Sequence, residues 1–203
     1  MIMDNINIEK QILVQMKKSK RGELFFPDMF GDIAESAAIR KALQRLTEKE
    51  DITRVAQGIY VIPQTNSLIG KIIPSLEAVA AAIAKRDRAR IVPTGIQALY
   101  LLGLSTQIPI KVVYLTDGAQ RIVNVGKQTI NFKRTTPKNV STKGEISGLV
   151  IQALKALGKD KVNENEKKII LDHLKNEKKE LILHDIKLAP EWIAKIMNKA
   201  LNN

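Results

Sequence analysis

The sequence contains no cysteine and only two histidines among its 203 residues. The lack of cysteine excludes disulfides, thiolate metal sites and a cysteine nucleophile. His173 and His184 lie in C-terminal stretches with a helical pattern, where a surface or packing role is far more common than a role as ligand or base. Asp117 has no acidic partner nearby in sequence, whereas a metal-dependent nuclease normally shows a tighter set of carboxylates. The sequence therefore offers no candidate metal site.

The short motifs of nucleotide-binding and metal-dependent enzymes are also missing. The chain has no GxxxxGK loop followed by serine or threonine, no GxGxxG turn and no HExxH pair. Serine, threonine and lysine are too common to nominate a nucleophile. We therefore assign no catalytic residue, no metal and no cofactor, and we do not expect an enzyme.

Aromatic residues make up only 4% of the chain, although apolar residues make up 44%. A core of useful size is therefore expected, built mostly from Ile, Leu, Val and Ala. No run of 18 apolar residues exists, so no segment is predicted to cross a membrane. The first residues, MIMDNINIEK, do not resemble a secretory signal. We expect a cytoplasmic protein.

The chain is strongly basic and its charge is unevenly distributed. The net charge is +12 and the sequence pI is about 9.8, which favours a polyanionic partner. Residues 1–66 carry a net charge of +1, residues 67–144 carry +9 and residues 145–203 carry +2. If nucleic acid is bound, the middle segment is expected to contact phosphate as well. A lysine-rich surface that only keeps the protein soluble is the simpler alternative.

Residues 24–63 form the most informative segment. They follow a helix expected from about Asn7 to Lys18. Pro27 is suited to open a short helix, and Gly31 to close it. Ser36 is a plausible N-cap for a second, amphipathic helix. The core face of that helix is predicted from apolar residues at helical spacing, namely Ile39, Ala42, Leu43 and Leu46.

A two-stranded ribbon is predicted directly after this helix. Its strands are residues 52–55 and 59–62, with Gly58 at the tip, where glycine accepts a positive φ. Helix, helix and ribbon in this order are typical of a winged helix-turn-helix, which usually places one helix in a DNA groove. The same fold also serves in protein interaction, so the order alone does not fix the function.

The exposed face of the second helix and the ribbon carry candidate DNA contacts. Arginine and glutamine can read base edges, and lysine suits phosphate. On the helix these residues are Lys41, Gln44 and Arg45, with Arg40 on the flank. On the ribbon, Arg54 and Gln57 lie where a wing meets the DNA backbone. The alternative is an ordinary solvated helix face.

The remainder of the chain is expected to form an α+β domain. A long helix is predicted from Pro74 to about residue 92, and a second helix capped by Thr94. Strands at 111–116, 121–125 and 129–134, with short turns between them, predict a small antiparallel meander. Residues 145–203 read as helical. We therefore expect an α+β protein with a winged-helix domain at 1–66 and a second domain at 67–203, in which 67–144 contains the basic sheet.

Two stretches together resemble a known family. LQRLTEKEDITRVAQGIYVIP is similar to the winged helix of AbiEi-type antitoxins, and VPTGIQALYLLGLSTQIPIKVVYLTDGAQRIVNVGKQTINFKRT is similar to the domain that follows it. The helical tail fits that family more loosely. The resemblance implies an antitoxin of a type IV toxin–antitoxin pair, linked to abortive phage infection, whose winged helix binds promoter repeats and represses its own operon.

The resemblance also implies partners and contact residues. The partners are double-stranded DNA and, functionally, a nucleotidyltransferase-like toxin with which no stable complex is expected; a homodimer is possible. DNA contact falls on the residues that match the recognition helix and wing: Ser36, Arg40, Lys41, Gln44, Arg45, Arg54 and Gln57. The +9 segment is the expected antitoxin or phosphate-contact surface, mainly through Arg86, Arg88, Arg90, Arg121, Lys133 and Arg134. The alternative is a winged-helix regulator whose C-terminal domain only dimerises or senses a ligand.

Overall fold

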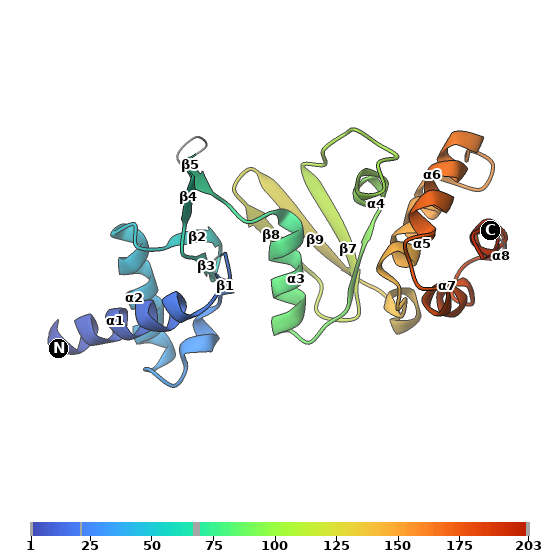
Figure 1. Ribbon diagram of the computed structural model, residues 1–203. Coiled ribbons are helices and arrows are strands. Elements are labelled where there is room, and N and C mark those ends of the chain that lie inside the picture. Colours follow the sequence, from blue (N-terminus) through green and yellow to red (C-terminus); the bar gives the residue numbers. More distant parts are fainter. Residues whose placement is uncertain (1, 21, 67–69, 202–203) are drawn as a thin grey trace. The chain divides into compact units, whose positions relative to one another are not determined.

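The computed structural model describes residues 2–20, 22–66 and 70–201, and within these ranges the chain is an α+β protein. It divides into two compact units (Figure 1). The N-terminal unit comprises Met1–Ala82 with Val123–Gly126, and the C-terminal unit comprises Ile83–Ile122 with Lys127–Asn203. The first unit therefore extends past residue 66, the boundary expected from the sequence.

The N-terminal unit begins with two helices and a small sheet. Its sheet has the order β1–β3–β2, and both pairings are antiparallel. Gly58 at the tip between β2 and β3 has a φ of +69°, so the expected left-handed glycine is confirmed. The elements, in chain order, are α1 (Ile2–Lys18), β1 (Leu24–Phe25), the 3-10 helix η1 (Pro27–Phe30), α2 (Ser36–Glu48), β2 (Thr53–Ala56) and β3 (Ile59–Val61).

The core of this unit forms where α1, α2 and the sheet meet. The predicted apolar stripe of α2 is confirmed, because all four of its residues are buried. Ile12 and Met16 of α1 join them, and Phe25 stacks on Phe30 with ring centroids 6.1 Å apart. Most of the stabilisation of these short elements comes from this burial, since helices of 13 to 17 residues are marginal by themselves.

The structure differs from the sequence-based expectation at two places in this unit. The predicted N-cap of α2 is wrong: Glu35 holds that position without a side-chain hydrogen bond, and Ser36 is the first helical residue. Beyond the ribbon, where the sequence predicts no strand, Gln64–Asn66 (β4) pairs antiparallel with Gly70–Ile72 (β5). Alternation of polar and β-branched residues is too short there to reveal a strand in advance.

A four-stranded sheet has the order β6–β7–β9–β8; β6, β7 and β9 belong to the C-terminal unit, as do Arg121 and Ile122 of β8. The three predicted strands are confirmed in position, but the predicted meander is wrong, because β7 and β9 pair in parallel, from Lys111↔Thr129 to Thr116↔Arg134. The strands are β6 (Ile91–Thr94), β7 (Lys111–Thr116), β8 (Arg121–Val125) and β9 (Gln128–Arg134).

The segment after β7 does not form a hairpin turn, because β8 pairs with β9 and not with β7. A Cβ on Gly118 in this segment would lie 2.7 Å from the Cβ of Ala89, so the glycine permits close approach of the residues before β6.

The helices before this sheet also differ from the prediction. The long helix predicted to about residue 92 ends at Arg86, as α3 (Leu76–Arg86), and Thr94 is the last residue of β6 instead of a helix cap.

Helices surround the rest of this unit's core. Short helix α4 (Ile96–Leu101) and helix α5 (Glu145–Leu157) contribute buried residues to one cluster with α6 (Glu164–Leu174), α7 (Lys179–Ile186) and α8 (Glu191–Asn198) (Figure 1). No helix in the described part of the chain is long and apolar enough to cross a membrane.

Two carboxylates hold the N-terminus of α5. Asp185 is fully buried and accepts hydrogen bonds from the backbone N–H groups of Lys143 and Gly144 and from the hydroxyl of Ser147, at 2.6 to 2.9 Å. Glu177 accepts from the backbone N–H of Ser147 at 2.6 Å. A Cβ at Gly144 would overlap the Glu177 carboxylate and the Ser147 hydroxyl, so a larger residue would displace these side chains from the helix N-terminus. Charged acceptors thereby satisfy the helix N–H groups that lack a partner within the helix.

Candidate nucleic-acid interface

A groove lies between α2 and the β2–β3 ribbon of the N-terminal unit. Its volume is about 580 Å³. Four of the seven predicted DNA contacts line it: two from the helix and two from the ribbon. Its lining residues are Pro27, Arg40, Gln44, Thr47, Glu48, Arg54, Gln57, Gly58 and Tyr60. The fold thus brings together four predicted contacts that span 17 residues of sequence, from Arg40 to Gln57.

The helix side of the groove is organised by hydrogen bonds one turn apart. The guanidinium of Arg40 donates to the hydroxyl of Ser36, and the amide of Gln44 donates to Glu48 at 2.9 Å. These contacts leave the carbonyl oxygen and one N–H of the Gln44 amide for another partner. A glutamine side chain with both a donor and an acceptor is suited to the edge of an adenine.

The ribbon side of the groove is open to solvent. Arg54 and Gln57 are exposed, and within the described residues neither side chain makes a hydrogen bond or an ion pair. Lys41 of α2 is also exposed without such a partner. These three side chains keep their full capacity to donate to phosphate or to a base.

Arg45 points elsewhere. Its guanidinium lies 3.6 Å from the carboxylate of Glu9 on α1, and Lys49 donates to the same carboxylate at 2.6 Å. Because the Glu9 side chain is only 8% exposed, two cations compensate an almost buried negative charge. The position of Arg45 on the predicted polar face gave no sign of this role, since its partner is 36 residues away.

The sequence interpretation missed three polar residues of the groove. Thr47 donates to the backbone oxygen of Leu43 at 2.8 Å and so is engaged within its own helix. Glu48 adds a negative charge beside Gln44. Tyr60 is 6% exposed and belongs to the core, yet it lines the groove floor. Helical spacing from Arg40 could have identified Thr47 and Glu48, at i+7 and i+8.

The six predicted basic residues of the middle segment lie around one end of the four-stranded sheet, here called the basic end: Arg86, Arg88, Arg90, Arg121, Lys133 and Arg134. The strand register places Ile91, Thr116 and Arg134 at this same end. The structure therefore brings the predicted surface together from three segments of the chain, residues 86–90, 121 and 133–134.

Much of this positive charge is neutralised within the unit. Asp87 forms ion pairs with both Arg86, at 2.9 Å, and Arg121. The Arg121 guanidinium also lies over the Phe132 ring, 5.5 Å from its centroid. Burial and the nearby Arg86 lower the pKa of Arg121. Among the described residues, the buried Nε of Arg121 has no hydrogen-bond partner. Arg121 therefore has a packing role at the basic end.

Arg90 is similarly engaged. It donates to Asp117 from its backbone at 2.7 Å and from its side chain at 2.8 Å, and reaches the Ser141 hydroxyl at 3.4 Å. Burial raises the pKa of Asp117, but the hydrogen bonds from Arg90 outweigh it, so the pKa lies below its ordinary value of 3.8. Asp87 and Asp117 are the residues that sequence analysis left out of this surface.

The remaining cations of the basic end are exposed. The side chains of Arg88, Lys133 and Arg134 make no hydrogen bond or ion pair with any residue that the structure describes. Outside this set, burial and, to a smaller extent, the charge of nearby Lys138 lower the pKa of Lys155 on α5.

The two histidines take part in local hydrogen bonds. His173 contacts the backbone oxygen of Leu102 at 3.1 Å, and His184 contacts Asp185 at 2.7 Å. In the described ranges, no group of three or more His, Asp or Glu side chains is arranged to hold a metal ion.

Comparison with other proteins places the chain in a family. Curated proteins gave no match. A family described as "Family of unknown function (DUF6088)" matches residues 11–182, which is most of the chain. The chain therefore belongs to this family.

Proposed function

We propose that the N-terminal unit is a winged helix-turn-helix that binds double-stranded DNA, with α2 as the recognition helix and the β2–β3 ribbon as the wing. One observation carries the proposal: the groove gathers Arg40, Gln44, Arg54 and Gln57 from exactly these two elements, and the last two are unpaired among the described residues. The element order α1, β1, η1, α2, β2, β3 and the sheet order β1–β3–β2 agree with this fold.

The proposed binding mode follows from the side chains available. Ala37 and Ala38 at the start of α2 are small, which allows the helix to approach the floor of the major groove. Gln44 and Arg40 then face base edges, and Lys41 faces phosphate. Arg54 and Gln57 extend from the ribbon to the sugar–phosphate backbone. Arg45 is left out of this mode because it neutralises Glu9.

The wider role proposed here is that of a type IV antitoxin that represses its own operon in the cytoplasm. Its support is the resemblance to AbiEi-type antitoxins together with the basic end of the C-terminal unit. In this role the protein counteracts a nucleotidyltransferase-like toxin without a stable complex. Arg88, Lys133 and Arg134 are the residues of the basic end with free donors for this task.

The DNA proposal is tested by titrating the purified protein against its own upstream DNA and against scrambled DNA over a salt series. We expect a preference for the upstream sequence of roughly 10³-fold or more that persists at moderate salt. Equal affinity for both duplexes, lost steeply as salt rises, would contradict a sequence-reading role and leave a general polyanion contact.

The antitoxin proposal is tested by co-expression with the product of the neighbouring gene. Arg88→Ala combined with Arg134→Ala is expected to reduce growth rescue. The matched control is Lys168→Ala with Lys179→Ala, which removes the same charge from exposed positions of α6 and α7. Equal rescue by both doubles would argue against the basic end.

A further inference from the structure

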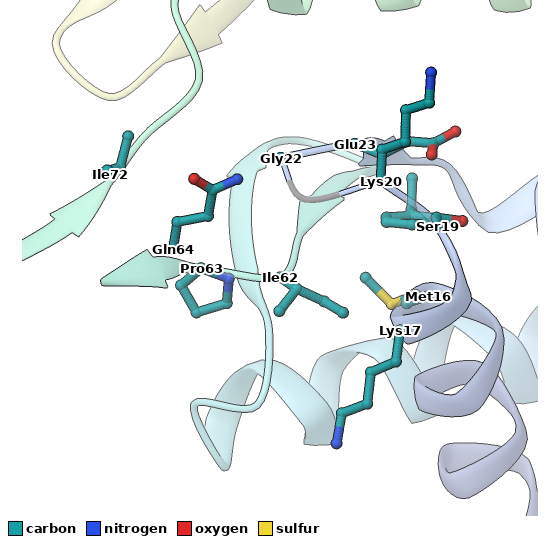
Figure 2. Close-up of a pocket in the computed structure, with 11 residues that line it drawn as sticks. Met16, Lys17, Ser19, Lys20, Gly22, Glu23, Ile62, Pro63, Gln64 and Ile72 are labelled. Atoms are coloured by element: carbon teal, nitrogen blue, oxygen red, sulfur yellow. The ribbon is translucent and has the colours of Figure 1, made fainter. Parts of the chain in front are cut away.

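We propose that a pocket at the C-terminal end of α1 binds a small organic anion with an apolar body. The pocket lies wholly within the N-terminal unit, apart from the groove between α2 and the ribbon, and has a volume of about 410 Å³ (Figure 2). Known small-molecule sites commonly enclose about 300–1,000 Å³. Its lining residues are Met16, Lys17, Ser19, Lys20, Gly22, Glu23, Phe25, Ile62, Pro63, Gln64 and Ile72.

The floor of the pocket is apolar and fixed. Met16 is 1% exposed and Phe25 is 2% exposed, so both are anchored in the core of the unit. Figure 2 shows Met16 and Ile62 directed toward each other across the hollow, with Pro63 beside Ile62. A ring or a branched hydrocarbon placed here would contact the buried side chains of the floor and would remove the exposed apolar surface of Ile62 and Ile72 from water.

The rim of the pocket is positively charged. Lys17 and Lys20 extend from it in opposite directions, and neither forms an ion pair within the described residues (Figure 2). Glu23 is the single acidic residue of the lining. Lysines in the last turn of a helix often only complement the helix dipole. This explains Lys17 but not Lys20, because α1 ends at Lys18.

An unpaired amide completes the polar side. Within the described residues, the Gln64 side chain has no hydrogen-bond partner. Gly22 has a φ of +80°, and a Cβ there would lie 3.1 Å from Nε2 of Gln64. Glycine thus gives the turn its left-handed conformation and leaves the amide room to move. The Gln64 N–H and the Lys20 ammonium are both donors, which selects an anionic group such as a carboxylate or a sulfonate.

These features define the ligand class. The apolar floor disfavours a bare inorganic anion, and the ammonium rim disfavours an uncharged hydrocarbon. An aromatic or branched carboxylate, or a chemically similar sulfonate, satisfies both. This inference does not depend on DNA binding, because the lining shares no residue with the groove between α2 and the ribbon.

The test uses full-length protein and a pair of fluorescent probes. 8-Anilinonaphthalene-1-sulfonate carries both the apolar body and the anion, and 1-anilinonaphthalene lacks the sulfonate. We expect one saturable site for the sulfonate probe, and about 10-fold weaker binding of it by Lys20→Gln, which corresponds to one charge-assisted hydrogen bond. Binding of the uncharged probe is expected to be equal in wild type and Lys20→Gln.

The matched control is Lys10→Gln, which removes the same charge from an exposed position of α1 outside the pocket. It is expected to bind both probes as the wild type does. A second variant, Gln64→Ala, is expected to weaken only the sulfonate probe. An equal loss in Lys10→Gln and Lys20→Gln, or the absence of a saturable site, would overturn the proposal. So would displacement of the probe by scrambled duplex DNA, which would make this rim a phosphate contact.

Discussion

The groove of the N-terminal unit and the basic end of the C-terminal unit differ in how their cations are used. The groove belongs to a segment with a net charge of only +1, yet Arg54 has no ion-pair partner among the described residues. The basic end belongs to a segment with +9, yet Asp87 and Asp117 bind three of its arginines.

The lesson is that the net charge of a segment does not measure its capacity to bind an anion. An arginine already paired with a carboxylate must give up that partner before it meets a phosphate. An unpaired arginine loses only water. The nearly neutral segment keeps Arg54 unpaired in its groove, whereas half of the six predicted cations of the basic end are paired with carboxylates, leaving Arg88, Lys133 and Arg134.

The largest expected effect separates these two surfaces. Arg40→Ala with Arg54→Ala should weaken binding to the upstream DNA by roughly 2–4 kcal/mol, since each contributes about 1–3 kcal/mol if it contacts DNA. Arg88→Ala with Arg90→Ala should cost less than about 1 kcal/mol, because Arg90 is already held by Asp117. Fluorescence anisotropy at one salt concentration measures both. Equal losses would remove the distinction between the surfaces.

The next effect tests the neutralisation directly. Asp87→Asn removes the negative charge that Arg86 and Arg121 share, so affinity for scrambled DNA should rise roughly 3- to 10-fold while the free energy of unfolding falls by about 1–2 kcal/mol. The matched control is Asp172→Asn, which removes the same charge from an exposed pair with Lys175. If both variants raise the affinity equally, only net charge matters.

A smaller effect is expected at Arg45. Arg45→Ala should lower the free energy of unfolding by about 0.5–1 kcal/mol, because Lys49 still compensates Glu9. Binding to the upstream DNA should change little. Arg54→Ala should behave in the opposite way, with normal stability and weaker DNA binding. A specific loss of DNA affinity in Arg45→Ala would show that its pairing with Glu9 breaks on the DNA.

The smallest effect concerns pH. Because the folded pKa of Asp117 lies below 3.8, its stabilising contribution is present above about pH 4 and is lost as pH falls through the folded pKa. Asp117→Asn should therefore be less stable than wild type at pH 6, by no more than about 1 kcal/mol, and the difference should shrink as pH falls below about 4. Urea unfolding over a pH series from 6 downward measures this. A difference that does not shrink at any acidic pH would mean that the ionised carboxylate is not responsible.

Local signals predicted much of the fold but little of its long-range pairing. The stripe of α2, the ribbon with Gly58 and the positions of β7, β8 and β9 follow from periodicity and turn residues. The parallel pairing of β7 with β9 does not, because it depends on which strand reaches the sheet centre. Ile91–Thr94 was hidden within a helical pattern, and only its β-branched residues and proline could have indicated a strand.

In the candidate site, too, local proximity could be predicted from the sequence and long-range pairing could not. Arg40 and Gln44 share a helix face, so their proximity follows from the period of the helix. The engagement of Arg45 with Glu9, and of Arg90 with Asp117, joins residues far apart in the chain. No pattern within a single segment could distinguish these paired arginines from Arg54.

Asp185 and Glu177, the two carboxylates that bind the N-terminus of α5, limit how far the chain can be shortened. The family match ends at residue 182, before Asp185, although Asp185 accepts the N–H groups that begin α5. A protein trimmed to the matched region would keep the helix but lose the acceptor at its start, leaving Gly144 and Ser147 as buried donors. The C-terminal unit also needs α8, whose Ile193 and Met197 are buried in the same core cluster as α5. A shortened chain that fails to rescue growth would therefore report lost folding before it reported lost recognition.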